Sequence, residues 1–159
     1  MKRSTQLYSL ALLLLTLTTA GCIHKTGGSV TPWERVHTYN AALAEANNTV
    51  EKGAEAVVTS GFSTAQQMAP VINWTGQVAM LHQQITSILG QGQATQANIA
   101  SVKALVDQVK ASLQALPPTA LGLKNPKSQR SFNDDVANIG LLADSILSSL
   151  QAAASGGTP

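Results

Sequence analysis

The residues whose types could support chemistry are few and widely spaced in this chain. Glu34 and His37 form one Glu-x-x-His motif, which places both side chains on one helical face and occurs in carboxylate-bridged di-iron bundles. Such a site also needs a second copy of the motif and further inward glutamates, and the later segments supply only aspartates. Glu34 also lies three residues after Thr31, where it can close a helix-capping box. We therefore expect a helix cap and a surface histidine, and no metal site.

The other residue types that serve catalysis lack partners in the sequence. His82 has no Cys, Asp or Glu one helical turn away to orient it. The serines and threonines lack a neighbouring base and the strained turn that presents a catalytic hydroxyl. Gly90-Gln91-Gly92 is not followed by the Lys-Ser/Thr pair of a phosphate-binding loop. These features predict that the protein is not an enzyme and takes no cofactor.

The single cysteine has the most clearly specified chemistry. Cys22 has no second cysteine with which to form an internal disulfide. Lys2 and Arg3 precede a short apolar stretch, residues 10–17, which is too short to cross a bilayer of about 30 Å as a helix. A positive start, a short apolar segment and small residues are typical of an export signal. The sequence predicts that this signal, residues 1–21, ends just before Cys22.

Residues 17–22, Leu-Thr-Thr-Ala-Gly-Cys, resemble the lipobox of bacterial lipoproteins. The resemblance implies cleavage before Cys22, diacylation of its thiol and often acylation of the new amino terminus. Two or three acyl chains, at ~0.8 kcal/mol per buried CH₂, hold a protein stably on a membrane. Ile23 rather than Asp after the cysteine implies, in a Gram-negative host, sorting to the periplasmic face of the outer membrane. The alternative is an ordinary cleaved signal with an incidental cysteine.

Charge is scarce throughout the chain. Charged residues make up 11% of the 159 residues, and the net charge is +2. This composition excludes a charged disordered tail and lacks the basic patch of a nucleic-acid-binding protein. Cleavage would remove Lys2 and Arg3 and leave a neutral mature chain. The expected attachment to the membrane therefore depends on the acyl chains rather than on anionic lipids.

The mature chain divides into a tether, a helical domain and a tail. Residues 22–31 have no apolar period and contain Gly27-Gly28-Ser29, which is typical of a flexible tether with a reach of about 30 Å. Residues 32–154 form the predicted helical domain, and residues 155–159 form a frayed tail. The first helix is expected to start at Pro32, capped by Thr31, and to end at Ser60-Gly61.

Three further helices are expected after Gly61. The second has a capping box at Ser63 and Gln66 but is expected to start properly near Pro70, because proline disrupts a helix interior. The third ends before Pro117, and the fourth starts at Ser131 after a long loop over 117–130. The apolar residues recur seven apart in paired rows: Val36, Leu43, Val50 and Val57 with Tyr39, Ala46 and Gly53; Val71, Val78 and Ile85 with Trp74, Leu81 and Ile88; Ile99, Val106 and Leu113 with Val102, Val109 and Leu116; Val136, Ala143 and Leu150 with Phe132, Ile139 and Ile146.

These helices must bury their apolar rows against one another. No segment alternates apolar and polar residues at the period of a strand. We therefore predict an all-α fold, either an antiparallel four-helix bundle or an elongated pair of helical hairpins. Pro70 and the loop over 117–130 leave both arrangements open.

The segment 56–102 contains no Lys, Arg, Asp or Glu. Ile72 and Met80 fall outside the apolar rows and are expected to face outward, amid glutamines that include Gln77 and Gln84. Apolar atoms among uncharged polar groups are typical of a protein interface. A generally low charge content is the alternative explanation. We take Ile72, Met80, Gln77 and Gln84 as a candidate interface.

The expected role is that of a membrane-anchored structural or accessory subunit of the cell envelope, which binds another copy of itself or an envelope protein. The alternative is a module that holds a small apolar ligand or lipid within the bundle. Ala46, Gly53 and Ala143 are then the candidate gaps in the core, because their side chains are small.

Overall fold

The computed structural model describes residues 30–114, 116 and 126–156, which form four helices. They are α2 (Pro32–Thr59), α3 (Ala65–Leu89), α4 (Gln96–Gln114) and α5 (Pro126–Ala154), with no strand among the described residues. The predicted all-α fold is confirmed. The predicted signal, Cys22, the tether up to residue 29, residues 117–125 and the end of the tail lie outside the described residues.

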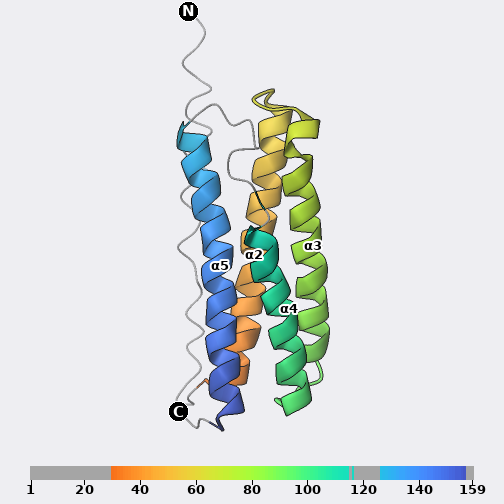
Figure 1. The fold of residues 1–159 in the computed structure, drawn as a ribbon, viewed down its shortest axis with the longest axis vertical. Coiled ribbons are helices and arrows are strands. Elements are labelled where there is room, and N and C mark those ends of the chain that lie inside the picture. The colour runs from red at the N-terminus through yellow and green to blue at the C-terminus, as the bar shows by residue number, and fades with distance from the viewer. Residues whose placement is uncertain (1–29, 115, 117–125, 157–159) are drawn as a thin grey trace, which may run out of the picture.

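The helices pack antiparallel as a ring (Figure 1). α2 contacts α3 and α5, and α4 contacts the same two helices from the other side. This closes an antiparallel four-helix bundle, so the alternative of an elongated pair of helical hairpins is wrong. The start of α2, the α3–α4 turn and the end of α5 lie at one end of the bundle (Figure 1). The α2–α3 turn lies at the other end.

The start of α2 confirms the predicted capping box. The Thr31 hydroxyl accepts the Glu34 backbone N–H at 3.2 Å, and the Glu34 carboxylate accepts the Thr31 N–H at 2.8 Å. Glu34 therefore caps the helix, as expected. At the other end of α2, Gly61 has a φ of +72°, which a residue with a side chain rarely adopts.

The second buried row of α2 differs from the prediction. Tyr39 and Ala46 are only half-buried and Gly53 is exposed. The row four residues after Val36, rather than three, points into the core because it faces α3, to which its two asparagines hydrogen-bond. The buried residues of α2 are Trp33, Val36, Asn40, Leu43, Asn47, Val50 and Ala54.

Pro70 does not mark the start of the second helix, so that prediction is wrong. α3 starts at Ala65, with Thr64 as the cap and Gln67 completing the capping box. Pro70 lies close to the start of α3. It has no N–H to donate to the carbonyl of Gln66 in the first turn, and its ring crowds that carbonyl, so the helix loses one interior backbone hydrogen bond. Met68 and Val71, both fully buried, hold the helix on either side of it.

The last helix starts earlier than predicted. α5 begins at Pro126 rather than Ser131, so part of the expected loop is helical. Proline suits the first position of a helix, where its missing N–H has no partner to lose. Lys127 and Arg130 are therefore exposed on the first turns of α5. The remaining loop residues, 117–125, lie outside the described residues.

The predicted apolar rows of α3, α4 and α5 are all buried or half-buried, which confirms them. By length and hydropathy, residues 129–154 of α5 could also cross a membrane, a test that core helices of soluble proteins pass as well. In the bundle, Ile139, Ala143 and Ile146 are fully buried against the other helices. We therefore treat α5 as a core helix.

Candidate functional site

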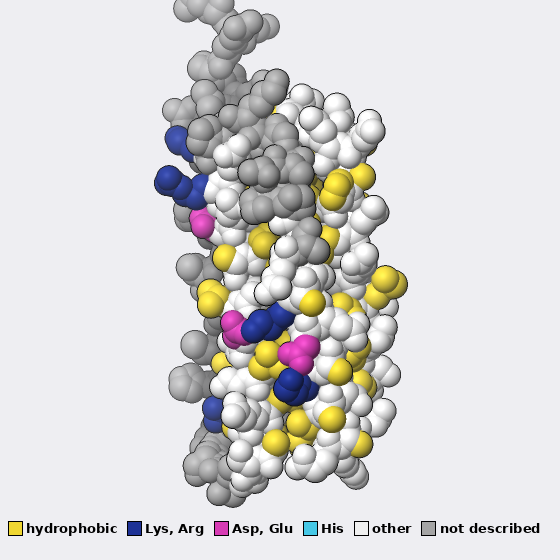
Figure 2. Space-filling view, in the orientation of Figure 1, with side chains coloured by type: hydrophobic (Ala, Val, Ile, Leu, Met, Phe, Trp, Pro, Cys, Tyr) yellow, Lys and Arg dark blue, Asp and Glu magenta, His cyan; other side chains and the backbone are white. Residues whose placement is uncertain are grey.

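One side of the bundle is free of charge. α3 contains no Lys, Arg, Asp or Glu. In Figure 2, the charged side chains gather over α5 and α4, while the side formed by α3 shows only apolar and neutral polar side chains. The ion pairs of α4 lie away from α3: Lys103 pairs with Asp107 at 2.7 Å, and Lys110 pairs with Asp144 of α5.

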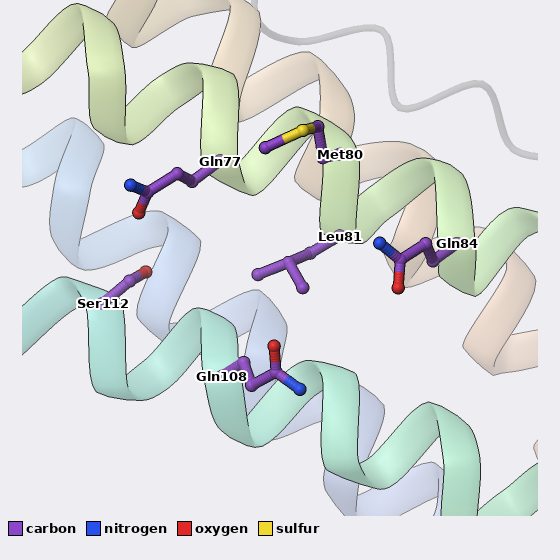
Figure 3. Close-up of a pocket in the computed structure, with 6 residues that line it drawn as sticks. All are labelled: Gln77, Met80, Leu81, Gln84, Gln108 and Ser112. Atoms are coloured by element: carbon purple, nitrogen blue, oxygen red, sulfur yellow. The ribbon is translucent and has the colours of Figure 1, made fainter.

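A groove opens to solvent between α3 and α4, with a volume of about 330 Å³. We call it the α3–α4 groove. Figure 3 shows Leu81 between the two helices, with side chains of α3 along one wall and of α4 along the other. Its lining residues are Gln77, Met80, Leu81, Gln84, Gln108 and Ser112. Three of the four predicted interface residues, Gln77, Met80 and Gln84, therefore lie together.

Met80 is the most exposed large apolar side chain on α3, with 57% of its surface accessible. It faces outward because it lies two residues after Val78, which is fully buried. Gln77 and Gln84 lie three residues before it and four after it, so they flank it on the same side of the helix. The outward position predicted for Met80 is confirmed.

Ile72 does not share this surface, so its predicted outward position is wrong. Its side chain is half-buried and packs against the core. Eight helical residues separate Ile72 from Met80, which places them about 80° apart around the axis. Ile72 therefore lies on another flank of α3 and does not line the groove.

A hydrogen bond fixes the spacing of α3 and α4 beside the groove. The Trp74 indole N–H donates to the Ser112 hydroxyl at 3.0 Å, and that hydroxyl donates to the Val109 carbonyl at 2.7 Å. Trp74 itself is buried, with 4% of its surface exposed. The groove wall is thus held by a buried aromatic anchor. The sequence identified Trp74 as a core residue but contained no sign of its partner on α4.

His82 lies at the margin of the core, as predicted, and is held by a side chain of α2. Its Nδ1 is 3.1 Å from Asn40 Oδ1, and the amide of Asn40 donates to the Thr86 hydroxyl at 3.0 Å. Because an amide oxygen only accepts, His82 Nδ1 carries the proton. Burial lowers the pKa of His82. These contacts explain His82 as part of the packing of α2 on α3.

Asn47 lies one heptad after Asn40 and is as deeply buried, with 3% of its surface exposed. Its amide N–H donates to the Thr75 carbonyl at 2.9 Å. Its Oδ1 has no hydrogen-bond partner among the described residues. The apolar rows predicted for α2 contain neither asparagine. Their positions, four residues after Val36 and Leu43, are nevertheless compatible with burial in the core.

The carboxylates and histidines do not gather into a metal-binding cluster within the described part of the chain. Glu34 is engaged in the helix cap, and His37 contacts the edge of Trp33 with ring centres 6.4 Å apart.

Burial raises the pKa of Asp135, and the neighbouring Asp134 raises it further. Ala46, Gly53 and Ala143, the predicted gaps, do not line the α3–α4 groove.

Neither the protein-family models, nor the curated proteins, nor the solved structures contain a match to this chain.

Proposed function

We propose that this protein is a lipid-anchored subunit of the cell envelope with a structural or accessory role, and that it binds a protein partner through the α3–α4 groove. The observation that carries the proposal is the exposed Met80 on a charge-free helix beside that groove. The lipobox-like segment ending at Cys22 supports the anchor.

The composition of this face favours burial against another protein. Removing ions from water costs far more free energy than removing amides and apolar groups, provided that the amides find hydrogen-bond partners. Interface cores are accordingly depleted of charge and enriched in methionine. The groove offers Met80 and Leu81 as apolar contacts, with the amides of Gln77, Gln84 and Gln108 around them. This arrangement matches an apolar centre with a neutral polar rim.

The position of the anchor leaves the groove accessible. Cys22 lies nine residues before Thr31, so the tether reaches about 30 Å at most from the start of α2. The groove lies along the side of the bundle, between two helices that run along its long axis (Figure 1). A protein tethered by the start of α2 therefore presents the groove to neighbours on the same membrane.

The alternative of an internal ligand site has less support from the geometry. Gly53 is exposed and Ala46 half-buried, so neither leaves a gap in the core. Ala143 is fully buried within the core cluster. We therefore favour a contact surface over a module that holds an apolar ligand within the bundle.

A charge-pair variant tests the contact surface. Met80→Glu combined with Gln84→Lys keeps the net charge and places Glu four residues before Lys, an order that supports a helix. We expect the variant to keep its helical circular dichroism and to lose the wild-type crosslinked species in native membranes. Both positions are exposed, so folding should be spared.

The matched control is Ala137→Glu with Leu141→Lys, an equally spaced pair at exposed positions of α5. It should retain the wild-type crosslinked species. If both folded variants crosslink like the wild type, the groove is not the contact surface.

Cys22→Ser tests the anchor separately. It should abolish incorporation of labelled palmitate and leave an unprocessed or mislocalised chain. A wild-type protein that is cleaved, soluble and unlabelled would refute the anchor.

A further inference from the structure

The packing of α2 on α3 includes a line of polar groups inside the bundle. Asn40 and Asn47 lie one heptad apart on α2, and each has only 3% of its surface exposed. The amide of Asn40 bonds to His82 and Thr86 of α3, at 3.1 Å and 3.0 Å. The amide of Asn47 donates to the Thr75 carbonyl at 2.9 Å. We call Asn40, Asn47, Thr75, His82 and Thr86 the polar seam.

The apolar residues of α2 do not specify the flank on which α3 packs. Residues three and four positions after the Val36 row lie on opposite sides of it. One flank carries Asn40 and Asn47, and the other carries Tyr39 and Ala46, which are half-buried. The second flank is the more apolar of the two, yet α3 packs on the asparagines and leaves the other flank toward α5.

An antiparallel ring of four helices can turn with either hand. The two hands have the same neighbouring helices, but the flanks that face one another are exchanged. In the opposite hand, α5 would pack on the asparagine flank of α2. Within the described part of α5, the buried side chains are apolar except Ser149, whose hydroxyl donates to the Ser145 carbonyl of the same helix. Each buried polar group left without a partner would disfavour that hand by roughly five- to 150-fold.

The hand of the bundle also decides whether the α3–α4 groove forms. The groove exists because the flank of α3 that carries Leu81 faces the flank of α4 that carries Ser112. In the opposite hand, the first of these flanks would face α2 and the second would face α5. The hydrogen bond between Trp74 and Ser112 would be lost as well. The residues of the polar seam do not themselves line the groove.

From these observations we infer that the polar seam selects the hand of the bundle and thereby brings α3 and α4 together as the walls of the groove. The polar seam does not maximise stability, since Asn47 Oδ1 has no partner among the described residues. Buried polar groups can instead specify one arrangement among several of similar stability. This inference concerns the fold and does not rest on the proposed function.

A crosslink between α4 and α5 reports the hand. Lys110 and Asp144 form an ion pair across these helices, and in the opposite hand their flanks would face different helices. The parent for this test is the full chain with Lys110→Cys and Asp144→Cys. Treated in dilute solution with a short bis-maleimide, it should give an intrachain crosslink between positions 110 and 144, which mass spectrometry identifies and quantifies.

The seam variant adds Asn40→Leu, Asn47→Leu and His82→Leu to the parent. Removing the imidazole together with its acceptor leaves neither one buried without a partner, so the variant should keep its helical circular dichroism. We expect the crosslink yield to fall by about twofold or more, because both hands become populated. Asn47→Leu alone should retain the parent yield, because Asn40 still bonds to α3.

The matched control carries leucine at exposed positions instead, as Asn48→Leu, Asn138→Leu and His37→Leu. It should retain the parent yield. A folded seam variant that crosslinks like the parent would overturn the inference. Loss of the helical circular dichroism in the seam variant would also overturn it, because the polar seam would then be required for stability rather than for the choice of hand.

Discussion

Two asparagines in the core of α2 have different hydrogen bonding at equal burial. Asn40 is paired through both ends of its amide, with His82 and Thr86. Asn47 donates to the Thr75 carbonyl, but its Oδ1 has no partner among the described residues. A buried acceptor without a partner costs about 1–3 kcal/mol of stability. The same substitution at the two positions should therefore have opposite effects.

Asn47→Leu should raise the free energy of unfolding by about 1 kcal/mol, because it removes the unpaired Oδ1. Asn40→Leu should lower it by about 1–3 kcal/mol, because it leaves His82 Nδ1 without its acceptor. Urea denaturation of both variants measures the difference. A larger loss at Asn47 than at Asn40 would contradict the hydrogen bonding described for the two residues.

His82 should make stability depend on pH. Burial lowers its pKa below the usual value of 6.5. Below that pH the unfolded chain takes up a proton that the folded chain resists. The contribution of His82 to the free energy of unfolding is therefore complete above about pH 6.5, and it declines as the pH falls through the pKa of His82 in the folded chain. Asp135 has the opposite effect. Because its pKa is raised in the folded chain, its contribution to stability declines as the pH rises above about 3.8.

The expected result is a fall in the urea midpoint between about pH 7 and about pH 5, with a smaller fall in His82→Gln. Glutamine still offers an N–H to Asn40, so the comparison isolates the titration. An unchanged pH dependence in the variant would show that His82 does not contribute to it.

At the scale of the element, the spacing of apolar residues in α3 predicts which residues are buried but not where the helix starts. The rows headed by Val71 and Trp74 were predicted correctly because burial follows the helical period. The start of the helix differs from the prediction, which places it near Pro70 rather than at Ala65. The cost of Pro70 in an early turn is smaller than the gain from burying Met68, which precedes it in the helix.

Pro70→Ala distinguishes the two starts of α3. In the structure, Pro70 is an exposed interior residue, so alanine restores a backbone donor and should stabilise the protein by about 1–2 kcal/mol. If the helix started at Pro70, the same change would be neutral or slightly destabilising. The midpoint of thermal or urea unfolding measures the effect.

At the scale of the whole molecule, the sequence predicts the four helices and singles out part of the lining of the α3–α4 groove. Met80, Gln77 and Gln84 could be identified because they lie outside the apolar rows of a charge-free segment. Gln108 and Ser112 could not, because their role depends on α4 packing beside α3. The contact between α2 and α5, which closes the ring, could not be predicted either, since no local sequence pattern specifies which helices are neighbours.

If the face around Met80 binds a protein partner, Met80 is covered in the membrane, and its accessibility there can be measured. The Met80→Cys and Leu141→Cys variants should be labelled with a small maleimide, first in native membranes and then after extraction and dilution to monomer. We expect slow labelling of the thiol at position 80 in membranes and fast labelling after dilution, whereas the thiol at position 141 should react fast in both. Equal labelling at position 80 in the two conditions would contradict the proposal that this face binds a protein partner.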